Sequence, residues 1–235
     1  MGGKLQFFVA GLGRFGQSVA ITLSRMGFDV MAMDIDENVV QSLSGTLDYV
    51  VAADAADEKN LKAIGAGDAD VAVVCIGDLG MNLMTALLLK EMNVKKVVAK
   101  ARNDLHGKML SKIGVDRVIY SEKEMGVRVA HNLIFPGIVD YIEMDHDITI
   151  LSIHVPEDWI GKDMRSLEVR QKYNITVVAI KRESEVIVNP QPDLTIKQDD
   201  LVIVLGKAED IRNCGEEFAQ RLDRKNPVSY KSTSV

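Results

Sequence analysis

The stretch Phe8-Val9-Ala10-Gly11-Leu12-Gly13-Arg14-Phe15-Gly16 decides the fold of the first half of the chain. It joins a short apolar run, residues 5–10, to a segment with helical spacing, residues 15–26. A continuous apolar run is typical of a parallel strand that is buried on both faces. Glycines at this spacing between a strand and a helix predict a phosphate-binding loop. In such a loop Gly11 makes the tight turn, Gly13 lets the backbone approach a diphosphate, and Gly16 lets helix and strand pack closely.

The rest of the first half alternates strand patterns with helical patterns. Strands alternating with helices at short spacing predict βαβ units, and therefore an α/β fold with a doubly wound parallel sheet of the Rossmann type. We assign residues 1–122 to this nucleotide-binding domain. The expected strands are 5–10, 29–33, 49–53, 70–76, 94–101 and 117–120, and the expected helices are 15–26, 37–43, 58–64, 81–92 and 105–113.

The pattern changes after Glu122. Residues 123–134 have helical spacing, Pro136-Gly137 interrupts it, and residues 138–142 are expected to resume the helix, so that 123–145 form crossover helices suited to association. Polar and apolar residues then alternate, which predicts a small α+β module over 146–224 with one solvated sheet face. Its expected strands are 148–154, 176–180, 186–188 and 201–205, and its helices are 166–172 and 209 to about 222. Residues 225–235 are expected to be a disordered tail.

Composition excludes several classes of function. The 235 residues carry 28 Lys and Arg against 34 Asp and Glu, for a net charge of −6, whereas nucleic-acid phosphates reward concentrated positive charge. No segment reaches the roughly 18 to 20 apolar residues that span a bilayer, and no leader peptide is expected at Met1, so we expect any membrane contact to pass through a partner. Cys75 and Cys214 are expected to be buried, reduced thiols, which suits the cytosol.

Polar residues follow several predicted strands at the sheet edge where ligands bind. Asp34, 18 residues after Gly16, can accept hydrogen bonds from ribose hydroxyls, and its charge disfavours the 2′-phosphate of NADP. Arg14 places a fixed positive charge in the phosphate loop. Lys100 can neutralise phosphate, and Glu122 can hold a divalent cation. The predicted nucleotide contacts are Gly11, Gly13, Arg14, Phe15, Gly16, Asp34, Ile35, Asp54, Ala55, Gly77 and Lys100, and the predicted metal ligand is Glu122.

The sequence shows no recognisable arrangement of catalytic residues. The four histidines stand outside any triad or metal-ligand spacing, and no Gly-Lys-Ser or Gly-Lys-Thr loop of an ATPase is present. The short second half offers few acid or base candidates for a second substrate. A binding module that reports nucleotide state therefore fits these residues better than an enzyme.

The phosphate loop, Lys100-Ala101-Arg102-Asn103, Lys112-Ile113-Gly114-Val115-Asp116 and Glu122-Lys123-Glu124-Met125-Gly126 together closely resemble the regulator-of-potassium-conductance (RCK, or KTN) domain of KtrA/TrkA-type proteins. The second half is similar to the TrkA-C module that accompanies this domain. The residues that carry this second likeness are Gly161-Lys162-Asp163, Ser166-Leu167, Asn174-Ile175, residues 178–182 and residues 199–206. The resemblance covers roughly residues 4–222.

The resemblance implies a cytoplasmic regulatory subunit that catalyses nothing and gates a membrane potassium channel or transporter of the Ktr/Trk type. Such proteins assemble as octameric rings beneath the potassium-translocating subunit. ATP and ADP compete for their Rossmann site, with ATP favouring the active ring.

The resemblance also implies individual roles at this site. Asp34 would hold the ribose, and Asp54-Ala55 would flank the adenine. Arg14 would contact the γ-phosphate of a neighbouring subunit's ATP, Lys100 would lie close to the phosphates, and Glu122 would meet a divalent cation across a dimer. Some relatives bind cyclic di-AMP between paired C-terminal modules. The residues that would correspond to that site are Arg170, Asn174 and Pro190.

Three alternatives stay open at this point. The first is the same architecture tuned to NAD and NADH, which would make the chain a redox-linked regulator. The second is a small NAD-dependent oxidoreductase, against which the scarcity of acid and base candidates counts. The third is a soluble domain of a larger channel.

Overall fold

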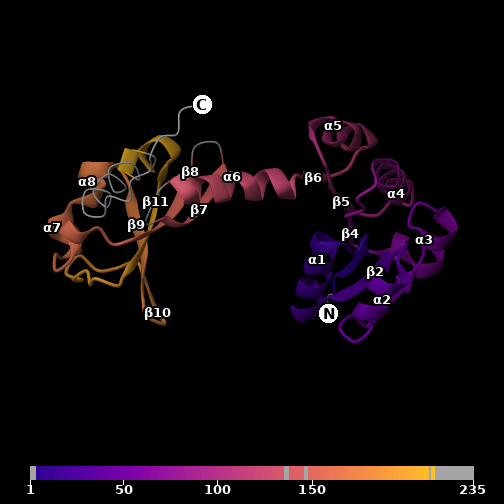
Figure 1. Cartoon of the computed structure of the whole chain (residues 1–235), viewed down its shortest axis with the longest axis horizontal. Helices are drawn as coiled ribbons and strands as arrows, with labels where there is room; N and C mark the ends of the chain where they lie inside the picture. The colour runs from indigo at the N-terminus through magenta and orange to yellow at the C-terminus, as the bar shows by residue number, and fades with distance from the viewer. Residues whose placement is uncertain (1–3, 135–137, 146–147, 212, 215–235) are drawn as a thin grey trace, which may run out of the picture. The chain divides into compact units, whose positions relative to one another are not determined.

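The computed structural model describes residues 4–134, 138–145, 148–211 and 213–214. The chain divides into two units, Met1–Glu124 and Met125–Val235 (Figure 1). The helix α6 (Ser121–Ile134) begins in the first unit and ends in the second. Within the described residues, every helix is too short or too polar to cross a membrane.

The first unit contains a six-stranded parallel sheet in the order β3-β2-β1-β4-β5-β6 (Figure 1). The strand order reverses between β1 and β4, and such a switch point opens a crevice at the carboxyl ends of the two strands. The predicted Rossmann-type sheet is confirmed. The strands are β1 (Gln6–Ala10), β2 (Asp29–Asp34), β3 (Tyr49–Ala52), β4 (Val71–Val74), β5 (Lys96–Lys100) and β6 (Arg117–Ile119).

Helices cover both faces of this sheet. Phe8 and Val9 are neighbours in β1, both are fully buried, and they belong to different apolar clusters. Val9 packs in the cluster that also contains residues of α1 and α2, whereas Phe8 packs in the cluster that contains residues of α3, α4 and α5. The helices are α1 (Arg14–Arg25), α2 (Glu37–Leu43), α3 (Glu58–Ile64), the 3-10 turn η1 (Ala66–Asp68), α4 (Leu79–Glu91) and α5 (Asp104–Ile113).

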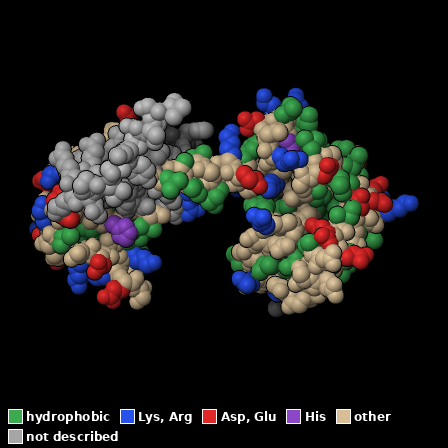
Figure 2. Space-filling model, viewed as in Figure 1, with side chains coloured by type: hydrophobic (Ala, Val, Ile, Leu, Met, Phe, Trp, Pro, Cys, Tyr) green, Lys and Arg blue, Asp and Glu red, His purple; other side chains and the backbone are tan. Residues whose placement is uncertain are grey.

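Charged side chains of both signs are spread over the surface of the first unit. On the face shown in Figure 2, Lys and Arg side chains are interspersed with Asp and Glu side chains. Ion pairs join some of these opposite charges, such as Lys62 with Glu58 at 2.6 Å and Lys95 with Asp70 at 2.5 Å. This visible face therefore agrees with the mixed charge of the sequence.

The second unit is built on a five-stranded antiparallel sheet in the order β10-β9-β11-β8-β7. In β8 the residues 149, 151 and 153 are buried while those between them are not, so burial alternates as predicted for a sheet with one covered face. Trp159, Ile180 and Val202 lie in the core. The strands are β7 (Ile138–Asp145), β8 (Ile148–His154), β9 (Thr176–Arg182), β10 (Glu185–Val188) and β11 (Leu201–Lys207).

The prediction of a helix over residues 138–142 was wrong, because this segment begins the strand β7. Ile138, Val139, Tyr141 and Ile142 are β-branched or aromatic residues, which favour strands. The antiparallel partner β8 satisfies the backbone of β7, and Asp145 pairs with Ile148 at the end of the hairpin. Within the described part of residues 123–145, the helix α6 is therefore followed by a strand instead of a second helix.

The predicted helix over residues 166–172 is two short helices, α7 (Met164–Leu167) and α8 (Val169–Tyr173), which follow the 3-10 turn η2 (Glu157–Trp159). Glu168 lies between them in the left-handed conformation with φ +49°, which interrupts a right-handed helix. Of the final helix predicted from residue 209, residues 209–211 and 213–214 are helical, and the helix begins one residue earlier, at 208. Its remainder, the tail 225–235, Pro136-Gly137 and His146 lie outside the described residues.

Candidate nucleotide-binding site

The phosphate loop has the geometry that its glycines predict. Gly11 has φ +88°, and its N–H donates to the Met33 carbonyl oxygen at 2.8 Å. A Cβ at Gly16 would lie 1.9 Å from the Gly11 carbonyl oxygen, so α1 packs against the loop too closely for any side chain there. A Cβ at Gly13, by contrast, would have no described atom within 4 Å. The loop is therefore closed at Gly11 and Gly16 and open at Gly13, where a phosphate would approach.

Asp34 connects the end of β2 to this loop. Its Oδ2 accepts a hydrogen bond from the Leu12 N–H at 2.5 Å, and its Oδ1 accepts one from the Asp36 N–H at 2.9 Å. An ionised carboxylate has about four lone-pair positions, so two backbone donors leave capacity for ribose hydroxyls. The backbone bonds hold the carboxylate in place before any ligand arrives.

Asp34 belongs to a cleft of about 240 Å³, which we call the apolar lobe. The lobe lies at the carboxyl ends of β1, β2, β3 and β4, on both sides of the switch point. Most of its wall is apolar, and Asp34 and Asp78 supply its two carboxylates. The lobe is lined by Gly11, Met33, Asp34, Ile35, Ala53, Ala55, Ile76, Gly77, Asp78 and Met81.

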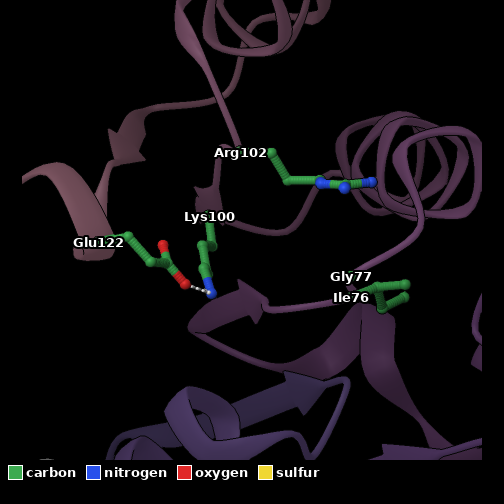
Figure 3. A pocket seen from close by; sticks show the side chains of 5 residues that line it. All are labelled: Ile76, Gly77, Lys100, Arg102 and Glu122. Atoms are coloured by element: carbon green, nitrogen blue, oxygen red, sulfur yellow. Dashed lines mark hydrogen bonds and ion pairs between the residues drawn. The ribbon is translucent and has the colours of Figure 1, made fainter.

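A second cleft of about 440 Å³, the cationic lobe, is lined by Ile76, Gly77, Lys100, Arg102 and Glu122 (Figure 3). The two lobes adjoin because they share Ile76 and Gly77. Lys100 Nζ lies 2.5 Å from Glu122 Oε1 and 5.7 Å from the centroid of the Phe15 ring. Phe15 therefore reaches the site through a cation–π contact with Lys100.

The surroundings of Glu122 and of Cys75 set the protonation of these two groups. The bonds that Glu122 accepts from Lys100 and from the Ser121 hydroxyl lower the pKa of its carboxyl group. Glu122 is therefore ionised at neutral pH, and Lys100 neutralises it. Burial raises the pKa of the Cys75 thiol, beneath the phosphate loop, to about 12, so this thiol stays protonated.

The structure brings most of the predicted contacts to these two lobes. Arg14 is exposed at the first residue of α1, and it is outside the lining of both lobes. The Asp54 carboxylate accepts the Ala56 N–H at 2.8 Å, and only Ala55 of that predicted pair lines the apolar lobe. The predicted residues that do line a lobe are Gly11, Asp34, Ile35, Ala55, Gly77, Lys100 and Glu122.

Sequence patterns missed several lining residues. Met33, Ala53 and Ile76 are indistinguishable in sequence from other apolar strand-end residues. Asp78 carries a detectable signal, since it stands directly before α4 and its carboxylate accepts the Met81 N–H at 2.9 Å as a helix cap. Arg102 stands two residues beyond β5, at the ligand edge of the sheet.

The predicted divalent cation site rests on Glu122 alone within one subunit. Both carboxylate oxygens of Glu122 accept hydrogen bonds, from Lys100 and Ser121. Across the described ranges, no group of three or more His, Cys, Asp or Glu side chains is arranged to hold a metal ion. The prediction of a cation shared across a dimer stays a prediction.

The residues predicted for cyclic di-AMP do not converge. Arg170 lines a shallow pocket of about 370 Å³ beside α7 and α8, together with Arg165 and Glu168. Asn174 is outside that lining, and its side-chain amide donates to Asp210 Oδ2 at 2.7 Å. Pro190 is also outside it. The second-messenger site stays a prediction.

Comparison with known proteins finds two matching domain families in the chain. Residues 7–121 match the TrkA-N domain and residues 148–219 match the TrkA-C domain. The Ktr system potassium uptake protein C of Bacillus subtilis (strain 168) is 41% identical over 209 residues, which cover 88% of this chain and 95% of that protein. The Ktr system potassium uptake protein A of the same organism is 35% identical over 213 residues, or 90% and 96% of the two chains.

A solved structure of the GsuK channel bound to NAD has the same fold, with a TM-score of 0.64 and 14% identity. The similarity covers 99% of this chain and 48% of that one, so the chain spans about half of the length of the channel protein. The two matched domains in this order, together with Ktr proteins that the chain covers almost from end to end, show that it belongs to the KtrA/TrkA-type family of RCK regulatory proteins of potassium uptake systems.

Proposed function

We propose that this chain binds ATP and ADP in its two adjoining lobes and, as a cytoplasmic subunit, gates a membrane potassium-translocating subunit of the Ktr/Trk type. The observation that carries the proposal is the order of groups along the site. A ribose acceptor, Asp34, lies in the apolar lobe, the open loop position Gly13 follows, and the cation Lys100 lies in the adjoining lobe. In ATP and ADP the ribose and the phosphates follow one another in the same order.

Each part of the nucleotide has a matching environment. Ala55 and Ile35 offer apolar surface to an adenine ring, and Ile35 is 63% exposed, with side-chain surface that a ring can cover. The N-terminus of α1 behind Gly13 favours negative charge. Arg14, exposed at that helix start, is free to reach a ligand in a neighbouring subunit of a ring. We therefore keep Arg14 as the proposed γ-phosphate sensor.

In this proposal, the ion pair of Lys100 and Glu122 couples ligand binding to the arrangement of the subunits. Glu122 is in the first turn of α6, the helix that continues into the second unit. A phosphate that binds Lys100 competes with Glu122, and the released carboxylate is then available to a divalent cation. A ligand shifts a conformational equilibrium only through its different affinities for the two states. If each site differs by ~1.4 kcal/mol, eight coupled sites shift a ring by about 11 kcal/mol.

Exposed apolar residues on α6 support self-association. Met125, Val129 and Leu133 recur every fourth residue, which places them on one side of the helix, and they are 53%, 47% and 79% exposed. A second copy of α6 would cover this surface. We propose that such pairing makes the dimers from which an octameric ring is assembled.

NAD or NADH at the same site is the second candidate. Asp34 accepts any ribose diol that carries no 2′-phosphate, and the two lobes together offer room for a dinucleotide. The relatives are potassium uptake proteins, so neither candidate includes a catalytic step.

Calorimetric titration of the native oligomer with ATP, ADP, NAD, NADH and NADPH tests the proposal. We expect ATP and ADP to bind, NADPH to be rejected, and only ATP to activate potassium uptake by the reconstituted membrane subunit. Binding of NAD and NADH alone would select the second candidate, and binding of none would contradict both. In the Arg14→Ala variant we expect ATP and ADP to bind alike. Unchanged discrimination would remove Arg14 as the sensor.

A further inference from the structure

The charges in the cationic lobe do not cancel. The lobe is lined by two cations, Lys100 and Arg102, and by one carboxylate, Glu122. Lys100 Nζ lies 2.5 Å from Glu122 Oε1, so these two groups neutralise each other. The Arg102 guanidinium makes no ion pair or side-chain hydrogen bond with any residue in the described ranges. Arg102 is therefore the source of the net positive charge of this lobe.

Backbone contacts hold Arg102 in a fixed loop. The Arg102 N–H donates to His106 Nδ1 at 3.3 Å, and the Asn103 side chain caps α5 by accepting the His106 N–H at 2.9 Å. The preceding residue is held as well, since the Ala101 N–H donates to the Ile119 carbonyl oxygen at 2.8 Å. Lys123 Nζ, 3.2 Å from Asp104 Oδ1, ties the start of α5 to α6. The side chain thus projects from a well-anchored base, while the residue is exposed.

The side chain of Arg102 takes a different direction from that of Lys100. In Figure 3 it extends away from the Lys100–Glu122 pair, toward the side of the pocket where Ile76 and Gly77 lie. Ile76 and Gly77 also line the apolar lobe, and a Cβ at Gly77 would have no described atom within 4 Å. The surface between the two lobes is thus open beside a guanidinium that has no partner among the described residues.

We propose that Arg102 binds a phosphate of the bound nucleotide as that ligand passes from the apolar lobe over Gly77, and that it sets the preference for ligands with two or more phosphates. This inference rests on the proposed function, because it assigns a further contact to the same site. A guanidinium is always charged and can give a phosphate two parallel N–H bonds. Lys100 can take a phosphate only by giving up Glu122, whereas Arg102 gives up no ion pair within the described part of the chain.

A series of ligands that differ in their number of phosphates tests the role of Arg102. Adenosine, AMP, ADP, ATP and NAD are titrated by calorimetry into the wild-type oligomer and into Arg102→Gln, Arg102→Lys and the control Arg117→Gln. Arg117 is exposed at the amino end of β6, away from the ligand edge of the sheet. Unfolding midpoints without ligand show that the variants fold alike.

We expect Arg102→Gln to bind the ligands with two or more phosphates at least about tenfold more weakly, with adenosine unchanged. Arg102→Lys should recover part of the lost affinity, because lysine restores the positive charge but cannot give a phosphate two parallel N–H bonds. Arg117→Gln should bind the ligands as the wild type does. Equal binding by wild type and Arg102→Gln, or an equal loss for adenosine, would overturn the inference and leave the proposed function standing. A wild-type chain that binds none of the five ligands would overturn both.

Discussion

Lys100 Nζ and Glu122 Oε1 are 2.5 Å apart, and this ion pair joins the carboxyl end of β5 to the first turn of α6. The Lys100 side chain is 19% exposed and that of Glu122 is 72% exposed, and both line the cationic lobe (Figure 3). A ligand phosphate that bound Lys100 would therefore compete with Glu122 for the same ammonium group. Sequence patterns assigned Lys100 to phosphate and Glu122 to metal, but they did not predict that each holds the other.

Glu122→Gln should tighten the binding of ATP when divalent cations are absent. The change removes the competing charge from Lys100, and we expect a gain of about threefold to tenfold at low ionic strength, which added salt reduces. Calorimetry in EDTA measures the effect, with Glu58→Gln, which alters an exposed carboxylate that pairs with Lys62, as the control. Affinity equal to wild type in EDTA would show that no such competition exists. With Mg²⁺ added, the gain should vanish if Glu122 holds the cation.

Gly16→Ala and Gly13→Ala should separate folding from binding. A Cβ at Gly16 meets the Gly11 carbonyl oxygen at 1.9 Å, so we expect the free energy of unfolding of the first unit to fall by about 1–3 kcal/mol. A Cβ at Gly13 meets no described atom within 4 Å, so the fold should persist while ADP binds about tenfold more weakly. Thermal unfolding and calorimetry measure the two effects. Normal ADP affinity in a folded Gly13→Ala variant would mean that the phosphates lie elsewhere.

Asp34→Asn should weaken adenosine and the nucleotides alike. In the proposed site the carboxylate supplies acceptors for the ribose, which all these ligands share, and we expect a loss of about tenfold for each. The same variant should reject NADPH less strongly because a negative charge has been removed. Parallel titrations against Asp48→Asn, a change at an exposed aspartate, provide the comparison. A loss confined to ATP would contradict the ribose role.

Asp200→Ala should destabilise the second unit. Asp200 is fully buried, and its two oxygens accept hydrogen bonds from Arg182 Nε and Nη2 at 2.7 Å each and from the Lys197 N–H at 2.8 Å. Removing one partner of a buried pair leaves the other uncompensated, so we expect a loss of about 3 kcal/mol in the free energy of unfolding. Chemical denaturation measures it, with the exposed neighbour Asp199→Ala as control. A variant as stable as the control would show that the pair contributes nothing.

The ion pair of Asp200 and Arg182 also makes the stability of the second unit depend on pH in a defined way. Burial by itself would raise the pKa of Asp200, but the bonds from Arg182 and from the Lys197 N–H outweigh burial and lower that pKa below 3.8. A lowered folded-state pKa contributes stability that is complete above the unfolded-state value and disappears as the pH falls through the folded-state value. We therefore expect the difference in stability between wild type and Asp200→Ala to be constant at neutral pH and to shrink only below about pH 4.

Local patterns were sufficient for most of the first unit. The middle residues of its central strands are apolar on both faces, because a parallel sheet covered by helices on both sides buries them, as Phe8 and Val9 show. The tight turn at Gly11 and the position of Asp34 at the end of β2 were also predictable, because they depend on neighbours close in sequence or on a regular strand-to-strand spacing.

The second half shows where local patterns fail. A short apolar segment such as residues 138–142 is compatible with a helix or a strand, and pairing with β8 decides for the strand. The left-handed Glu168 splits the helix predicted over residues 166–172, although nothing in its residue type indicates that conformation.

By itself, the sequence determined the family, the Rossmann-type sheet and the position of Asp34 at the end of β2, since these follow from residue spacing and from chemistry within one βα unit. Only the tertiary structure decided that Glu122 pairs with Lys100 while Arg102 keeps its charge unpaired in the described part of the chain. The physical reason is that charge balance in a pocket is a sum over side chains from separate strands and helices. That sum depends on distances between elements, which no local pattern encodes.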